Sequence, residues 1–254
     1  MREASSLILR TMSAVTAWGS YPNADPILSM RGVRKSFARG LARAAPRTVA
    51  LDSIDLDLAR SEIVAVFGGE GAGKTALLQC ACGLLRPDRG VVTWQGNQLS
   101  GTGTPAGIAY AAAVPLYYPF LTPRDVLAFR VARSCPTRCS ESMLIDEILE
   151  LAEIETRSED SIVQLSRAEL RRLSVAEALV TAPELLIVDT SATECVSEKL
   201  LSRVASRGVA VLVAVRDCIG VASVATRLVH LDMGRIDRSF SIESQMMFVA
   251  ERLH

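Results

Sequence analysis

The chain has 254 residues, of which 49% are hydrophobic and 22% are charged, and this composition excludes an intrinsically disordered chain. Its length allows one large domain or a core with a subdomain. Lys+Arg and Asp+Glu number 28 each, so the net charge gives no indication of a nucleic-acid partner. No apolar run reaches the roughly 18 residues of a membrane-spanning helix, so we expect no bilayer span.

In chain order, residues 1–26 are predicted to form an N-terminal extension and residues 27–254 a single domain. Short apolar or alternating runs predict strands at Ile27–Val33, Val49–Leu58, Glu62–Phe67, Val91–Trp94, Leu185–Asp189, Val209–Val215 and Ala225–Leu231, and Ile108–Val114 is a further apolar run. Helices are expected at Ala76–Leu85, Pro123–Ala132, Ser140–Ile154, Arg167–Val180 with Ser166 as its cap, Thr193–Ala205 and Ser241–Arg252. Strands that alternate with helices predict an α/β fold with a largely parallel sheet, and residues 115–165 are predicted to form an inserted helical subdomain.

A basic segment without acidic residues begins within the first predicted strand. Its members are Arg31, Arg34, Lys35, Arg39, Arg43 and Arg47. We favour a solvated hairpin loop as the interpretation of this segment. The alternative is a surface that attracts anionic lipid or nucleotide phosphates.

Six cysteines are scattered along the chain, and only His230 and His254 accompany them. Their spacing assembles no metal site. Cys135 and Cys139 come nearest to a pair, and we interpret them as two free thiols. This cysteine usage predicts a reducing, cytoplasmic setting.

The most informative stretch is a glycine-rich loop between a predicted strand and a predicted helix. It reads Gly68-Gly69-Glu70-Gly71-Ala72-Gly73-Lys74-Thr75. The glycines allow successive N–H groups to point inward as an anion nest, and the following helix adds its positive N-terminal end. Lys74 supplies a charge for the β- and γ-phosphates, and the Thr75 hydroxyl is suited to bind Mg²⁺. In this structural context the pattern predicts a phosphate-binding site.

Four further segments extend this pattern to most of the chain. They are Val49-Ala50-Leu51-Asp52, Gly83-Leu84-Leu85-Arg86-Pro87-Asp88-Arg89-Gly90, Leu165-Ser166 with Arg171-Arg172-Leu173-Ser174-Val175-Ala176, and Pro183-Glu184-Leu185-Leu186-Ile187-Val188-Asp189. With the glycine-rich loop, they make residues 27–240 resemble the nucleotide-binding subunit of ATP-binding-cassette (ABC) transporters. The third segment resembles the family's signature helix, and the fourth resembles its Walker B strand.

The resemblance implies an ABC-type P-loop NTPase fold with a mostly parallel core, an antiparallel N-terminal β part and an inserted helical subdomain. It implies that Gly68–Thr75 and Ala76 bind ATP, and that Thr75 and Asp189 hold Mg²⁺. Phe37 falls where the family stacks an aromatic side chain on adenine, and a core phenylalanine is the alternative for this residue. The implied partners are a second, different nucleotide-binding subunit in a head-to-tail dimer and a transmembrane permease, with no nucleic acid. The implied location is peripheral, on the cytoplasmic face of the membrane.

Departures from the family pattern concern the groups that activate water or sense the γ-phosphate. Thr190 occupies the place of the family's catalytic glutamate, and its neutral hydroxyl is a poor base. Arg216 occupies the place of the switch histidine and cannot relay a proton at neutral pH. Ala113 falls at the glutamine of the family's lid loop. Arg167 and Ala168 replace two signature glycines, and their side chains would crowd a backbone that should touch a phosphate.

These losses predict a subunit that binds Mg-ATP and hydrolyses it weakly or not at all. The alternative is a working ATPase that uses Glu194 and Arg216, or that acts through an intact partner subunit; a third class is a soluble regulator without a membrane partner. Tyr117, Tyr118 and Phe120 suit a groove for a membrane subunit, and packing within the helical subdomain is the equal alternative.

Overall fold

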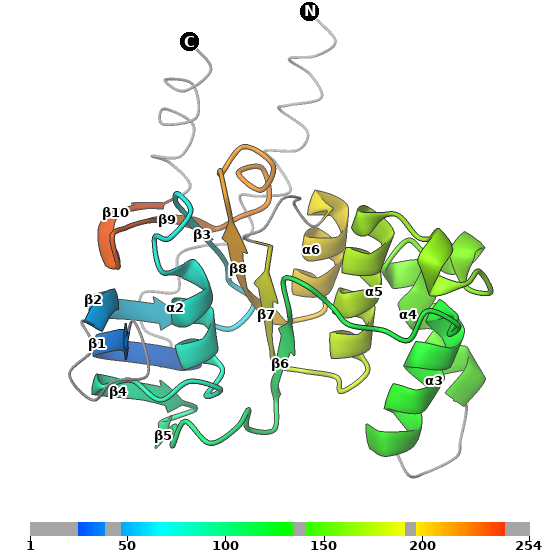
Figure 1. Ribbon diagram of the computed structural model, residues 1–254, viewed down its shortest axis with the longest axis horizontal. Coiled ribbons are helices and arrows are strands. Elements are labelled where there is room, and N and C mark those ends of the chain that lie inside the picture. Colours follow the sequence, from blue (N-terminus) through cyan, green and yellow to red (C-terminus); the bar gives the residue numbers. More distant parts are fainter. Residues whose placement is uncertain (1–24, 39–46, 135–140, 191–196, 242–254) are drawn as a thin grey trace, which may run out of the picture.

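Two β-sheets and a group of helices form the molecule (Figure 1). The computed structural model describes residues 25–38, 47–134, 141–190 and 197–241. The small sheet has the order β2-β1-β4-β5, and the large sheet has the order β10-β9-β3-β8-β7-β6. Within the described residues, no helix is both long enough and apolar enough to cross a bilayer.

The small sheet is antiparallel and contains β1 (Leu28–Ala38), β2 (Arg47–Leu58), β4 (Arg89–Trp94) and β5 (Asn97–Gln98). Buried and exposed residues alternate along the second half of β2, as expected of a strand with one face on the core. β1 continues five residues beyond the predicted Val33, because its far end still pairs with the start of β2. The sequence analysis did not predict β5, a two-residue strand that depends on pairing with β4.

The large sheet carries the phosphate loop. Its strands are β3 (Ile63–Phe67), β6 (Ile108–Ala111), β7 (Leu185–Asp189), β8 (Ala210–Val215), β9 (Arg227–Asp232) and β10 (Arg235–Ser241). All pairings are parallel except that of β10 with β9. Every residue of β3, β7 and β8 is buried, as their continuous apolar runs indicated. β6 covers the first four residues of the apolar run Ile108–Val114.

Helices cover the sheets and form a third layer at one side (Figure 1). They are α2 (Lys74–Ala81), α3 (Pro123–Ser134), α4 (Glu141–Leu151), α5 (Arg167–Leu179) and α6 (Glu198–Ala205), with short 3₁₀ helices at Glu155–Arg157 and Ile162–Gln164. α2 packs in a core with both sheets, whereas α3, α4 and α5 share a separate core. The antiparallel part, the parallel core and the helical group agree with the predicted fold class.

Two predicted helices end earlier than the sequence indicated. α2 ends at Ala81, and Gly83 follows with a φ of 76°, a left-handed conformation that stops a helix. α4 ends at Leu151 rather than Ile154, because Glu153 adopts a φ of 59°.

Two further helix predictions fall partly outside the described residues. The helix predicted at Thr193–Ala205 is described only as α6, and residues 191–196 lie outside the described part. The helix predicted at Ser241–Arg252 also lies outside it, apart from Ser241, which ends the unpredicted strand β10.

The described members of the basic segment lie in strands β1 and β2, and not in the solvated hairpin loop that the sequence analysis favoured. Acidic side chains from β2 and from the turn after α2 pair with its described members. The ion pairs are Arg31–Asp57 at 2.7 Å, Arg34–Asp52 at 3.6 Å, and Lys35–Asp88 and Arg47–Asp88 at 3.4 Å. Arg39 and Arg43 lie outside the described residues. The basic charge of the four described members is therefore offset locally, which weakens the case for an anion-attracting surface.

Candidate nucleotide site

Two glycines of the phosphate loop are required by their surroundings. A side chain on Gly68 would place its Cβ 2.1 Å from the carbonyl oxygen of Leu231. Gly73 has a φ of 102°, and a Cβ there would lie 2.2 Å from the carbonyl oxygen of Ala50. The loop therefore passes so close to β9 and β2 that only glycine fits at these two positions.

Backbone hydrogen bonds hold the loop against the turn between β9 and β10. The N–H of Gly234 donates to the carbonyl of Ala72 at 3.0 Å, and the N–H of Asp52 donates to the carbonyl of Gly234 at 2.8 Å. The loop, this turn and β2 thus form one connected unit. Asp52 also pairs with Arg235 at 2.5 Å, which ties β2 to the start of β10.

Lys74 begins α2 and is directed back over the loop. Its Nζ donates to the carbonyl oxygens of Gly68 and Gly69, both at 2.7 Å, and the residue is only 5% exposed. Burial lowers the pKa of this ammonium, the carboxylate of Asp189 raises it, and the positive charge of Arg216 lowers it. The loop thus fixes a partly desolvated cation where an anion can reach it.

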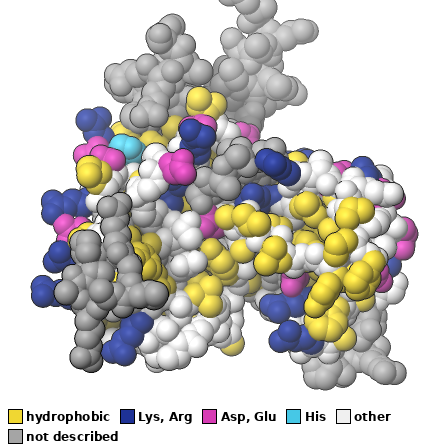
Figure 2. Space-filling model, viewed as in Figure 1, with side chains coloured by type: hydrophobic (Ala, Val, Ile, Leu, Met, Phe, Trp, Pro, Cys, Tyr) yellow, Lys and Arg dark blue, Asp and Glu magenta, His cyan; other side chains and the backbone are white. Residues whose placement is uncertain are grey.

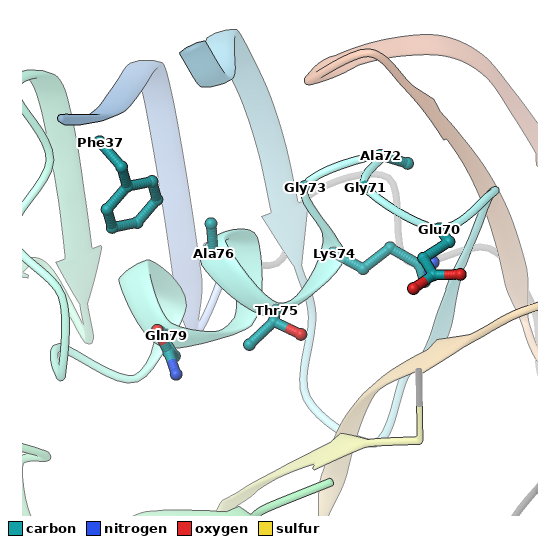
Figure 3. Close-up of a pocket in the computed structure, with 9 residues that line it drawn as sticks. All are labelled: Phe37, Glu70, Gly71, Ala72, Gly73, Lys74, Thr75, Ala76 and Gln79. Atoms are coloured by element: carbon teal, nitrogen blue, oxygen red, sulfur yellow. The ribbon is translucent and has the colours of Figure 1, made fainter. Parts of the chain in front are cut away.

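A cavity of about 450 Å³ lies along the loop and the first turns of α2 (Figure 3). Its lining residues are Phe37, Glu70, Gly71, Ala72, Gly73, Lys74, Thr75, Ala76 and Gln79. The predicted residues Gly68 and Gly69 are absent from this lining and contribute through their carbonyl groups. Phe37 and Lys74 lie toward opposite ends of the cavity, with Ala76 between them (Figure 3).

Phe37 is 43% exposed, so it is not the core residue that the alternative interpretation required. Its ring also lies 5.8 Å from the ammonium of Lys35. Gln79 is a lining residue that the sequence analysis missed. The signal for it was its position four residues after Thr75, which places both side chains on one face of the helix.

A second group of oxygens lies beside the loop at the end of β7. The hydroxyl of Thr75 donates to Oδ2 of Asp189 at 2.7 Å, and the hydroxyl of Tyr110 donates to the same oxygen at 3.4 Å. Asp189 is fully buried, and Arg171 donates to its backbone carbonyl at 2.7 Å. A hydroxyl and a carboxylate beside a phosphate loop are the oxygen ligands that Mg²⁺ prefers, so these residues fit the metal that accompanies ATP.

Thr190 follows this carboxylate and is not among the residues that line the cavity. The residue is 2% exposed. Its hydroxyl and its N–H both donate to the carbonyl of Ala214 in β8. The hydroxyl proton is therefore engaged in a hydrogen bond within the sheet.

The remaining departures are exposed or lie outside the described residues. Arg216 follows β8 directly and is exposed, and its charge acts on Lys74. Ala113 is half-buried after β6 and carries no polar side chain. Glu194 lies outside the described residues.

The start of α5 is capped by its own side chains. Ser166 accepts from the N–H of Glu169 at 3.2 Å, and the Glu169 carboxylate accepts from the N–H of Ser166 at 2.7 Å and from its hydroxyl at 2.8 Å. This capping box confirms Ser166 as the cap. Arg167 and Ala168 are exposed on the first turn. The hydrogen bonds from Ser166 hold the pKa of Glu169 below its usual range.

The described cysteines lie in the core. Cys80, Cys82 and Cys218 are buried, and burial raises the pKa of Cys80 to about 12. In the described part of the chain, no group of three or more His, Cys, Asp or Glu residues is placed to hold a metal ion. Cys135, Cys139 and Cys195 lie outside that part.

The three aromatic residues after β6 have different environments. Tyr117 packs against the core of α3, α4 and α5, and its hydroxyl donates to Glu177 at 3.2 Å. Tyr118 and Phe120 are 69% and 75% exposed and stack on each other with ring centroids 5.6 Å apart. Figure 2 shows hydrophobic side chains gathered over the helical side of the molecule. One aromatic residue therefore packs inside, and two form part of an exposed apolar surface.

A glycine-rich loop between a buried parallel strand and a helix, with a hydroxyl and a strand-end carboxylate beside it, defines a P-loop nucleotide-binding domain. The family model described as ABC transporter matches residues 51–193, more than half of the chain. The chain therefore belongs to the ABC transporter family.

Curated relatives support the same assignment. The chain is 29% identical over 233 residues to the lipoprotein-releasing system ATP-binding protein LolD of Chromohalobacter salexigens, covering 85% of this chain and 95% of that protein. It is 25% identical over 224 residues to the methionine import ATP-binding protein MetN of Brucella abortus, covering 83% of this chain. The chain spans 58% of the length of that relative.

Solved structures show the same fold. A dimeric ATP-binding cassette in a post-hydrolysis state, bound to ADP and Pi, superposes with a TM-score of 0.73 at 20% identity, covering 85% of this chain and 98% of that chain. The ADP conformation of another ATP-binding cassette gives a TM-score of 0.72 at 17% identity, covering 90% of this chain and 96% of that chain. At these identities the likeness establishes the fold alone.

Proposed function

We propose that this chain binds Mg-ATP as a subunit of an ABC transporter or related membrane complex and hydrolyses it weakly or not at all. The observation that carries the proposal is the state of Thr190. Its hydroxyl stands where the family has a carboxylate, and the residue is buried. The hydroxyl donates a hydrogen bond to the carbonyl oxygen of Ala214. A positioned general base contributes about 10²–10⁴ in rate, and no described side chain takes over this position.

The phosphate-binding half of the site supports the binding part of the proposal. Hydrogen bonds to the loop carbonyls hold Lys74 in place. The hydroxyl oxygen of Thr75 lies 2.7 Å from Oδ2 of Asp189, and both are oxygen ligands of the kind that Mg²⁺ prefers. Phe37, toward the end of the cavity away from Lys74, supplies an exposed ring for adenine.

The proposal extends to both composite sites of a head-to-tail dimer. Thr190 and Arg216 alter the site over this chain's own phosphate loop. Arg167, Ala168 and the Glu169 carboxylate occupy the turn that would face the partner's nucleotide, and a negative charge there opposes a phosphate. One chain would therefore weaken hydrolysis at both sites, which suits a regulatory subunit paired with a second, different nucleotide-binding subunit.

The membrane partner in this proposal is a permease subunit. The apolar surface for such a contact would come from Tyr118 and Phe120, which stack on each other, and from the exposed Leu116 nearby in the chain. The chain would then be peripheral on the cytoplasmic face of the membrane. The relatives are named for unlike cargoes, methionine and lipoproteins, so no cargo is proposed.

The decisive experiment measures nucleotide binding and phosphate release on the same preparation of the full chain. We expect saturable binding of Mg-ATP, its loss in Lys74→Ala, and phosphate release no faster than that variant. Glu184→Gln is the matched surface control, since this carboxylate pairs with Arg60 at the opposite end of β7. Turnover within about tenfold of an ordinary cassette ATPase, abolished by Lys74→Ala, would refute weak hydrolysis.

A working ATPase with substituted chemistry is the second candidate. Its supporting observation is that the charge of Arg216 reaches Lys74 at the phosphate end of the cavity, where a cation can stabilise a transferring phosphoryl group. This candidate requires Glu194→Gln to abolish phosphate release and spare nucleotide binding. If Glu194→Gln leaves the rate unchanged, this candidate is excluded.

A further inference from the structure

The phosphate loop contains one acidic side chain, Glu70, within a site otherwise built for anions. Glu70 is exposed and lines the cavity. In Figure 3 its carboxylate lies beside the extended side chain of Lys74, at the end of the cavity away from Phe37. Its negative charge acts on the Lys74 ammonium. Glu70 therefore occupies the end of the site that the last phosphate of a bound nucleotide would approach.

The charges around Lys74 show what Glu70 adds. The charged groups that act on this ammonium are Asp189, Arg216 and Glu70. Asp189 lies 2.7 Å from the Thr75 hydroxyl and is the carboxylate suited to a metal ion, whose charge would offset it. Glu70 lies on the loop before α2, and Figure 3 shows its side chain apart from that of Thr75. Its charge therefore stays opposed to the phosphates when Mg²⁺ is present.

The first turn of α2 carries Lys74 as its charged side chain and no acidic residue that would offset this positive charge. Its N-cap, Gly73, forms no side-chain cap. The positive end of the helix and the Lys74 ammonium thus attract both Glu70 and the incoming phosphates. A nucleotide must displace the carboxylate from this field.

We propose that Glu70 makes the site discriminate against the terminal phosphate, so that a nucleoside diphosphate binds at least as well as the triphosphate. The inference rests on the nucleotide site of the proposed function. A triphosphate carries more negative charge than a diphosphate, and places it closer to Glu70. The repulsion acts between the Glu70 carboxylate and the terminal phosphate, two solvent-exposed charges a few ångströms apart. It should weaken triphosphate binding about fivefold at low salt.

The test compares the dissociation constants of Mg-ATP and Mg-ADP by calorimetric titration of the full chain. Glu70→Gln keeps the shape and removes the charge, and we expect it to tighten ATP about fivefold more than ADP. Glu70→Asp keeps the charge and should retain most of the original ratio of the two constants. Glu184→Gln removes a distant surface carboxylate and should leave that ratio unchanged. Raising the salt should reduce the difference between the unsubstituted chain and Glu70→Gln.

Equal tightening of both nucleotides by Glu70→Gln would overturn the inference, as would weaker ATP binding, which would indicate that Glu70 assists the metal. An unsubstituted chain that binds Mg-ATP more tightly than Mg-ADP would also overturn it. If the chain hydrolyses ATP rapidly while the ratio shifts as expected, the inference stands and weak hydrolysis fails. If neither nucleotide binds, both proposals fail.

Discussion

Alanine substitution of three glycines in the phosphate loop separates two physical reasons for glycine. Gly73 combines a φ of 102° with a Cβ position 2.2 Å from the carbonyl oxygen of Ala50. Gly71 has a φ of 77°, and a Cβ there would meet no atom within 4 Å. Gly69 has neither a left-handed φ nor a close neighbour. Gly73→Ala therefore tests a steric clash together with backbone strain, and Gly71→Ala tests backbone strain alone. Gly69→Ala introduces neither effect and serves as the control.

The expected magnitudes follow from these geometries. An alanine in the left-handed region costs about 1–2 kcal/mol relative to glycine, and reduced freedom of the unfolded chain returns about 0.4–1 kcal/mol. We therefore expect Gly71→Ala to lower the free energy of unfolding by about 1 kcal/mol. Gly73→Ala must also displace β2 or the loop, and we expect a loss of at least about 3 kcal/mol. Gly69→Ala should stay within about 0.5 kcal/mol of the unsubstituted chain.

Equilibrium denaturation measures these differences, and a Mg-ATP titration of the folded fraction measures their effect on the site. Binding should be lost in Gly73→Ala, because the displaced segment carries the N–H groups that face the phosphates. Binding by Gly69→Ala should remain, since the Gly69 carbonyl that holds Lys74 is retained. If Gly73→Ala is no more destabilising than Gly71→Ala, the close approach of the loop to β2 is refuted.

Three further predictions concern hydrogen bonds and burial. Tyr110→Phe removes a hydrogen-bond donor to the Asp189 carboxylate and should weaken Mg²⁺-dependent ATP binding severalfold. Tyr117→Phe removes the hydrogen bond from another tyrosine to Glu177 and should leave ATP binding unchanged. Equal effects of the two substitutions would contradict a role for Tyr110 at the metal site. Glu169→Gln should lower the free energy of unfolding by about 0.5 kcal/mol at pH 7. Because the Ser166 hydrogen bonds lower the pKa of Glu169, the difference should be fully present above the usual glutamate pKa and lost as the pH falls through the lowered pKa. A difference that does not change with pH would refute this explanation. Cys80, with a pKa raised to about 12 by burial, should be alkylated only on unfolding, as peptide mass spectrometry of native and denatured chain can show; rapid native labelling would contradict the packing of α2.

The sequence predicted the parts of the fold that local patterns determine. The buried strands β3, β7 and β8 were evident as continuous apolar runs, and the phosphate loop was evident from its glycines. Ser166 was recognisable as a helix start, because a cap depends on residues within one turn. In these elements, the physical cause lies within a few residues of its effect.

The missed features depend on partners distant in sequence. β10 is largely polar, with Ile236 and Phe240 as its large apolar residues, and it is defined by its antiparallel pairing with β9. Acidic partners for the basic segment come from β2 and from Asp88, more than forty residues after Arg47. The direction of the Thr190 hydroxyl depends on the neighbouring strand β8. A single sequence carries no direct signal of such contacts.

The groups suited to nucleotide binding and the groups that depart from the family pattern lie on different elements of this fold. The proposed loss of hydrolysis is therefore compatible with retained nucleotide binding. The groups suited to hold phosphates come from the β3–α2 loop and from Asp189 at the end of β7. The altered groups lie after Asp189, after β8 and at the start of α5, where none of them supports the loop. Thr190, directly after β7, also donates a side-chain hydrogen bond to Ala214 in β8. The substitutions that would remove water activation therefore leave the backbone of the phosphate loop in place, and the free energy of nucleotide binding remains available to drive a conformational response without turnover.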